Sequence, residues 1–147
     1  MASRRKSREL ALQMLFQWEV GGHSPGKVTA SFLPSHKADP EVKEFARALF
    51  EGTVGEIETI DPLLRRHAEH WKLERMAAVD RNVLRLALHE LLHYPGTPPA
   101  VVINEAIELA RRFSAAESAE FVNGVLDAVR KSLSLPADAA KDVSPSP

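Results

Sequence analysis

One stretch of the sequence has residue types and a spacing that could bind a catalytic metal, because residues 89–93 read His-Glu-Leu-Leu-His. Two histidines four residues apart share one face of a helix and can both ligate zinc, with the glutamate between them as a candidate general base. A zinc peptidase also requires a third protein ligand and normally a strand edge that binds extended substrate. Because the chain offers no convincing strand, we interpret His89 and His93 as surface residues. We expect Glu90 to pair with a cation or a backbone donor of a neighbouring helix.

Other kinds of enzyme site are also missing from the sequence. The chain has no cysteine, which excludes disulfides, thiol catalysis and cysteine-bound metals. It has no glycine-rich phosphate loop, no nucleophile elbow of the G-x-S-x-G type and no convincing acid and base pair. We therefore predict that the protein is not an enzyme and has no cofactor.

A group of cations at the N-terminus indicates a different chemistry. Arg4, Arg5, Lys6 and Arg8 give the first eight residues a charge of +4, which leaves −5 for the rest of a chain whose total is −1. At a helix start, the free backbone N–H groups and the helix dipole also attract anions. Each phosphate that a cation neutralises releases condensed counterions, so such a cluster suits a polyanion. The alternative is a frayed terminus that only aids solubility.

Helices must position these residues, because apolar side chains recur mostly at spacings of three and four. The sequence predicts an all-α protein with about seven helices. Ser3 is a good N-cap for the first helix, which a glycine pair ends at 21–22, and Asp-Pro pairs at 39–40 and 61–62 mark two later helix starts. The segment 21–38 is expected to be a long connection. The predicted helices cover residues 3–20, about 40–54, a shorter stretch after 62, 79–94, 99–113 and 117–133, with a single turn at 73–77.

We expect one helical domain over residues 1–133 and a disordered tail over residues 134–147. The tail is rich in proline and serine and short of large apolar side chains, so it cannot offset the entropy cost of ordering. No run of about 18 apolar residues could span a bilayer, and the basic start lacks the apolar stretch of a secretory signal. These features predict a soluble, cytoplasmic protein without membrane contact.

The first predicted helix carries two apolar faces. One is a stripe suited to the core, and the other consists of Leu12 and Phe16, which lie one turn apart and about 120 to 160° away from that stripe. A second apolar patch on a terminal helix indicates a partner surface. The alternative is that segment 21–38 folds back and covers the patch. Arg5 and Arg8 project close to the same side, so one face could present cations beside an apolar contact.

Two later helices differ in how much of their surface is apolar. The helix over 79–94 is apolar around most of its circumference, which indicates the central helix of a bundle. The helix over 99–113 has one apolar and one polar face, and Glu108 and Arg112 are expected to form a solvated pair on the polar face. The polar stripe of the central helix comprises Arg81, Asn82, Arg85, His89 and His93.

Three parts of the sequence together resemble the NusB family, also called N-utilisation substance protein B. The similar stretches are Arg8–Trp18, then Asp80–Leu91, and finally Val102–Ala110 together with Phe121–Asp127. The similarity covers about residues 3–133 in the right order and spacing. It implies an all-helical fold of two three-helix bundles packed together, with an extra short helix.

The resemblance also implies a function. NusB-type proteins take part in transcription antitermination and pair with a small-subunit ribosomal protein, NusE. The pair binds single-stranded boxA RNA in nascent transcripts of ribosomal RNA operons and joins RNA polymerase and other Nus factors. The basic start matches the family's RNA-contacting arginines, and Phe16 and the region Glu117–Phe121 match positions at or near the RNA and ribosomal-protein surfaces. We assign RNA binding to Arg4, Arg5, Lys6, Arg8 and Phe121, and partner binding to Leu12, Phe16 and Glu117.

The assignment of Phe121 also agrees with the chemistry of RNA recognition. Single-stranded RNA binding combines cations for the backbone with aromatic rings on which bases stack. The alternative is that Phe121 belongs to the core. One departure from the family lies beside it, because Glu120 stands where better-known members tend to carry a basic residue. Its negative charge would repel phosphate.

A protein-only role is the main alternative function. In that case the chain is an adaptor or a homodimer, Leu12 and Phe16 make the protein contact, and the RNA surface is occluded. Some NusB-type proteins self-associate in this way.

Overall fold

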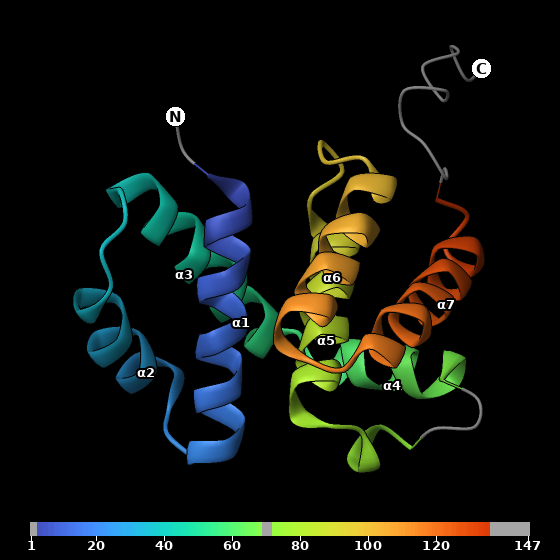
Figure 1. Cartoon of the computed structure of the whole chain (residues 1–147), viewed down its shortest axis with the longest axis horizontal. Helices are drawn as coiled ribbons and strands as arrows, with labels where there is room; N and C mark the ends of the chain where they lie inside the picture. Colours follow the sequence, from blue (N-terminus) through green and yellow to red (C-terminus); the bar gives the residue numbers. More distant parts are fainter. Residues whose placement is uncertain (1–2, 69–71, 136–147) are drawn as a thin grey trace.

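The computed structural model describes residues 3–68 and 72–135. These residues form seven α-helices and two short 3₁₀ helices and contain no strand, which confirms the all-α prediction (Figure 1). The α-helices are α1 (Arg4–Gly21), α2 (Pro25–Phe32), α3 (Pro40–Gly55), α4 (Ile57–His67), α5 (Ala78–His93), α6 (Pro99–Phe113) and α7 (Ala116–Ser132). The 3₁₀ helices are η1 (Leu33–Ser35) and η2 (Leu73–Arg75).

The ends of α1 follow from local capping. The Oγ of Ser3 accepts a hydrogen bond from the backbone N–H of Lys6 at 3.1 Å, which satisfies one of the free donors of the first turn. At the other end Gly22 adopts a left-handed conformation with φ of 71° and donates its N–H to the carbonyl of Trp18. A residue without Cβ adopts this conformation at little cost. The predicted bounds of the first helix, 3–20, are confirmed to within one residue.

The prediction that residues 21–38 form a connection without helices is wrong. α2 begins at Pro25, and Ser24 caps it by accepting a hydrogen bond from a backbone N–H three residues on. Val28 and Phe32 lie one turn apart and are both buried, so α2 packs its apolar side on the core. A serine followed by proline is a helix-start signal, but a helix of eight residues is too short for a clear periodic pattern.

α4 begins earlier than predicted, at Ile57 rather than after Pro62. Pro62 lies inside the helix, where its missing N–H removes one backbone hydrogen bond. Ile60 and Leu64 are fully buried one turn apart, one on each side of the proline. Burial of Ile60 therefore stabilises the helical turn ahead of Pro62.

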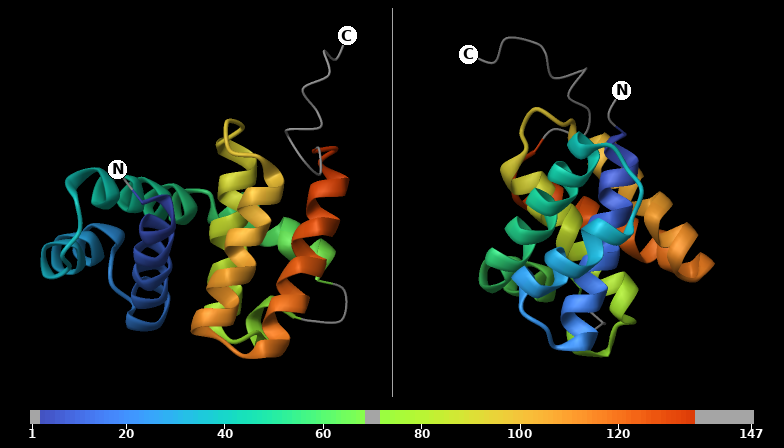
Figure 2. Two further views of the ribbon diagram at one scale, coloured as in Figure 1. Left: turned by 45° about the horizontal axis from the view of Figure 1, so that its top comes forward. Right: turned by 90° about the vertical axis from the view of Figure 1, so that its left-hand side faces the viewer.

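The helices gather in two groups, α1 to α3 and α4 to α7 (Figures 1 and 2). α1 packs most extensively on α3, and α6 packs most extensively on α7. α5 is the central helix, because it contacts α1, α3, α4, α6 and α7. The two groups correspond to the two bundles implied by the family resemblance, and α1 and α5 meet at the seam between them.

Most of the polar stripe of α5 lies inside the protein rather than on its surface. Asn82, Arg85 and His89 are 0%, 7% and 5% exposed. α5 is therefore buried on its polar side as well, where α1, α3 and α4 cover it. This arrangement requires partners for the buried charges, because an unpaired polar group inside a protein is costly.

His89 departs most from its predicted place at the surface. Its ring lies against Gly52 of α3, where a Cβ atom would stand only 2.4 Å from the ring. Its Nδ1 is buried and has no hydrogen-bond partner. Burial, together with the nearby His93, lowers the pKa of His89 to about 4, against an opposing effect of Glu56. Of the two histidines of the His-Glu-Leu-Leu-His stretch, only His93 is exposed. Its Nε2 lies 3.2 Å from a carboxylate oxygen of Glu56.

Two further expectations concern the ends of the chain and membranes. The predicted disordered tail over 134–147 lies outside the described residues from 136 onward, so it stays a prediction. Among the helices of the described residues, none combines the length and the apolar character needed to cross a membrane.

Acidification is expected to reduce stability through His89. Its pKa in the folded protein, about 4, lies below the ordinary value of 6.5, so the unfolded chain takes up the proton first. The contribution is present above about pH 6.5 and is lost as pH falls from there towards 4. The free energy of unfolding should fall by about 2 kcal/mol between about pH 7.5 and about pH 5, as measured by urea unfolding.

Two variants identify the titrating group in that experiment. His89→Gln should lose less stability on acidification than the parent, whereas His93→Gln should keep most of the pH dependence, because burial is the largest cause of the lowered pKa of His89. An unchanged pH dependence in His89→Gln would assign the effect to another group.

Candidate nucleic-acid and partner interface

The first turn of α1 presents cations to solvent. Arg4 and Arg5 are exposed and Lys6 is half-buried. The guanidinium of Arg4 lies 3.7 Å from the centroid of the Phe45 ring, a cation–π contact that orders the side chain without neutralising it. The same turn carries the free backbone N–H groups of a helix start. Three of the four predicted RNA-binding cations therefore lie where a phosphate can reach them.

The fourth cation, Arg8, is buried, contrary to the expectation of an exposed side chain. It makes a two-pronged ion pair with Glu90 of α5, with Nε donating to Oε1 at 2.8 Å and Nη2 donating to Oε2 at 2.5 Å. The two side chains are only 7% and 1% exposed. The expectation that a cation of a neighbouring helix satisfies Glu90 is confirmed. Arg8 joins the two groups of helices instead of facing solvent.

The exposed Arg5, in the first turn of α1, pairs with a different carboxylate, that of Glu105 on α6. Arg5 donates from Nε to Oε1 of Glu105 at 3.0 Å and from Nη2 to Oε2 at 2.8 Å. These hydrogen bonds hold the pKa of Glu105 below its ordinary value. Partial burial opposes the shift, and the charges of Arg5 and Arg8 add to it. Glu105 is therefore ionised at neutral pH.

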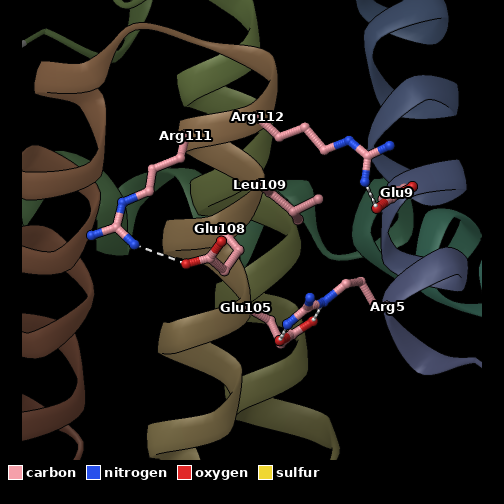
Figure 3. Close-up of a pocket in the computed structure, with 7 residues that line it drawn as sticks. All are labelled: Arg5, Glu9, Glu105, Glu108, Leu109, Arg111 and Arg112. Carbon is pink, nitrogen blue, oxygen red and sulfur yellow. Dashed lines mark hydrogen bonds and ion pairs between the residues drawn. The ribbon is translucent and has the colours of Figure 1, made fainter.

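These contacts lie in a hollow of about 220 Å³ between α1 and α6, which we call the α1/α6 furrow (Figure 3). Arg112 reaches across it from α6 and donates to Glu9 of α1 at 2.7 Å, whereas Arg111 extends away from α1 and donates to Glu108 at 2.8 Å. The predicted pair of Glu108 with Arg112 is therefore wrong. The furrow is lined by Arg5, Glu9, Glu105, Glu108, Leu109, Arg111 and Arg112.

The predicted partner patch on α1 is half buried. Leu12 is 3% exposed and belongs to the core, so the expectation that it lies on an open surface is wrong, whereas Phe16 is 39% exposed. Both line a shallow hollow of about 300 Å³ with Val79 of α5 and Phe113 of α6. No side chain of α2 lines this hollow, so Phe16 is not buried beneath the segment 21–38. An exposed aromatic ring beside half-buried apolar side chains suits a protein contact.

A third hollow, of about 240 Å³, lies between the start of α5 and the start of α7. Glu117 is exposed, and Phe121 is half-buried and packs against the edge of the core. Ser118 is held in place because its Oγ donates to Asp80 of α5 at 2.9 Å. Phe121 therefore has a core contact and a partly open face at the same time. The lining consists of Arg75, Met76, Ala77, Asp80, Glu117, Ser118 and Phe121.

One charged cluster at the seam has no counterpart in the sequence-based predictions. Glu19 of α1 lies 2.6 Å from Arg81 and 2.5 Å from Arg85, and Arg85 also contacts Asp61 of α4 at 2.8 Å. Burial raises the pKa of Glu19, but hydrogen bonds from Arg81 and Arg85 outweigh it and hold the pKa below its ordinary value. The arginines on the polar stripe of α5 indicate in the sequence that acidic side chains must face this stripe. Which acidic residues do so depends on how α1 and α4 pack on α5.

The His-Glu-Leu-Leu-His stretch shows no metal centre. Glu90 is bound to Arg8 and His93 contacts Glu56. Over residues 3–68 and 72–135, no group of three or more histidine, aspartate or glutamate side chains is arranged to hold a metal ion.

Comparison with known proteins relates the chain to one family. The model of the NusB family matches residues 5–131. A curated relative from Koribacter versatilis (strain Ellin345), a transcription antitermination protein NusB, is 54% identical over 132 residues, which cover 89% of this chain and 90% of the relative. The solved NusB of T. maritima has a TM-score of 0.80 at 38% identity and covers 89% of this chain and 93% of its own. A structure of antitermination factors NusB and NusE in complex with dsRNA has a TM-score of 0.80 at 28% identity, covering 88% of this chain and 96% of that one.

The two arginines that contact α6 and α5 should respond differently to truncation. Arg8→Ala is expected to lower the free energy of unfolding by about 3 to 5 kcal/mol, because it leaves Glu90 charged and buried without its partner. Arg5→Ala should change stability little, since Arg5 is exposed and Glu105 keeps the charge of Arg8 at 3.7 Å. Denaturant unfolding of both variants provides the test. A small loss for Arg8→Ala, equal to that of Arg5→Ala, would contradict a structural role.

Proposed function

This chain belongs to the NusB family, and on that premise we propose that it acts in the cytoplasm as a transcription antitermination factor. In this role it binds boxA-type single-stranded RNA together with a small-subunit ribosomal protein of the NusE type. RNA polymerase and other Nus factors complete the assembly. The prediction that the chain is not an enzyme agrees with its family, since the curated relative from Koribacter versatilis is a transcription antitermination protein.

The observation that carries the RNA-binding proposal is the open first turn of α1. Arg4 and Arg5 are exposed at a helix start whose backbone N–H groups also attract anions. Lys6 lies beside them at partial exposure. Cations at this density bind a nucleic-acid backbone through counterion release. Arg8 supports the site indirectly, because its ion pair with Glu90 fixes α1 on α5.

Base recognition is proposed for Phe121. Its partly open ring can stack a base, as aromatic side chains do in single-stranded RNA sites. Glu120 and Glu117 are both exposed close to it along α7. Their negative charges disfavour a phosphate at this point, so stacking supports the proposal better than backbone binding does.

Protein binding is proposed for Phe16, with Leu12 supporting it from below. Phe16 is the more exposed of the two and faces a shallow apolar hollow. The NusE-type partner is favoured because a similar solved structure contains antitermination factors NusB and NusE with dsRNA. Glu117 adds a charged group at the third hollow, where a partner can reach it.

The proposed RNA site predicts a specific loss on mutation. The double variant Arg4→Ala/Arg5→Ala should bind boxA-type RNA more weakly in the presence of the ribosomal protein, and its salt dependence should become shallower by up to about two phosphate contacts. Fluorescence anisotropy over a series of salt concentrations measures both effects. Arg47→Ala is the matched control, because Arg47 is also an ion-paired arginine of substantial exposure but lies on α3. Wild-type affinity and slope in the double variant would remove the N-terminal cations from the RNA site.

The proposed partner site predicts a separate loss. Phe16→Ala should weaken association with the ribosomal protein by at least about 2 kcal/mol, since truncated aromatic anchors typically cost that much. Val20→Ala, an exposed apolar residue one turn further along α1, should leave the affinity unchanged. Isothermal titration measures the affinity. A Phe16→Ala variant that binds the ribosomal protein normally but no longer self-associates would favour the homodimer instead.

A further inference from the structure

One planar pair of N–H donors of Arg5 that suits a phosphate, Nε with Nη2, is occupied in the free protein. Glu105 accepts two hydrogen bonds from the guanidinium through its two oxygens, at 3.0 and 2.8 Å. An arginine can bind a phosphate through this planar Nε and Nη2 pair, as it binds a carboxylate. An RNA phosphate that binds Arg5 through Nε and Nη2 must therefore take the place of the carboxylate.

We propose that Glu105 is a built-in competitor for RNA phosphate at Arg5, and that RNA binding exchanges this ion pair for an arginine–phosphate pair. The inference rests on the proposed function, because it concerns the regulation of the same RNA site. It gives Glu105 a defined role as a residue that limits RNA affinity.

The surroundings of Glu105 make such an exchange feasible. Its side chain is only 15% exposed, so an unpaired carboxylate there would be costly. Arg8 lies on its inner side, however, with Nη1 3.7 Å from Oε1 of Glu105. When Arg5 moves to a phosphate, Glu105 still has the charge of Arg8 beside it. The exchange therefore leaves no buried charge without a counter-charge.

Among the residues that the structure describes, the neighbouring ion pair in the furrow has no second cation beside its carboxylate. Arg112 is bound to Glu9, whose side chain is 8% exposed. In the part of the chain that the structure describes, Arg112 is the one cation within ion-pair distance of Glu9. Release of Arg112 would leave that carboxylate nearly buried and unpaired. Of the two furrow arginines whose carboxylate partners are largely buried, Arg5 is therefore the one that can exchange without leaving its partner unpaired.

The test compares variants that remove one negative charge each. Glu105→Gln should bind boxA-type RNA, in the presence of the ribosomal protein, about three to ten times more tightly than the parent, because a carboxylate no longer competes with phosphate for Arg5. Glu108→Gln is the matched control, since Glu108 lines the same furrow but is bound to Arg111. Its affinity should stay within about twofold of the parent. Fluorescence anisotropy at a fixed salt concentration measures all affinities.

A double variant tests whether the gain in RNA affinity arises from the release of Arg5. In the Arg5→Ala background, Glu105→Gln should bring no further gain. Glu105→Asp, which keeps the charge but shortens the side chain, should also bind RNA more tightly than the parent, because the carboxylate no longer spans the distance to Arg5. This variant covers the case in which Glu105→Gln unfolds, and circular dichroism verifies the fold of each variant.

The outcomes separate the inference from the proposed function. Wild-type affinity in both Glu105 variants, or an equal gain with and without Arg5, would overturn the competitor role while RNA binding itself stands. A parent protein that binds no boxA-type RNA even with the ribosomal protein would overturn the proposed function and this inference together.

Discussion

The buried ion pair between Arg8 and Glu90 is the contact on which the arrangement of the molecule depends. It joins α1 to the central helix α5 at the seam between the two groups of helices. Removing two charges from water is costly, and their attraction repays that cost only in the correct geometry. A shift of α1 along α5 by one turn would separate the two charges inside the protein. The pair therefore fixes the register of α1, and with it the position of every side chain that α1 presents to solvent.

The same constraint divides the N-terminal cations into two classes. Arg8 faces inward and is bound by Glu90, while Arg4 and Arg5 lie in the first turn and stay exposed. Glu105 lies between the two classes, because it binds Arg5 and lies within 3.7 Å of Arg8. A cluster of four cations that looks uniform in the sequence thus contains one structural cation, two exposed ones and the half-buried Lys6. The distinction arises from packing against α5 and α6, not from residue type.

The helices with a long apolar pattern could be predicted from the sequence. The residues of the candidate site could be predicted only in part. The bounds of α5 and α6 follow, to within one residue, from periodicity, and the cations of the first turn follow from their density. The burial of Arg8 depends on Glu90, which lies 82 residues away in sequence, and no local pattern encodes that contact. The burial of His89 likewise requires Gly52 of another helix.

The outward face of α1 has consequences for how RNA and protein binding combine. Arg5 and Phe16 are 11 residues apart on one helix, which at about 1.5 Å per residue separates them by about 16 Å along its axis. At its far end α1 is held by the contacts of Glu19 with Arg81 and Arg85. A helix anchored at both ends presents its cations and its exposed aromatic ring at a fixed separation. Two ligands that bind this face can therefore lie next to each other without a change of fold, and the rearrangement proposed for RNA binding is confined to the side chain of Arg5.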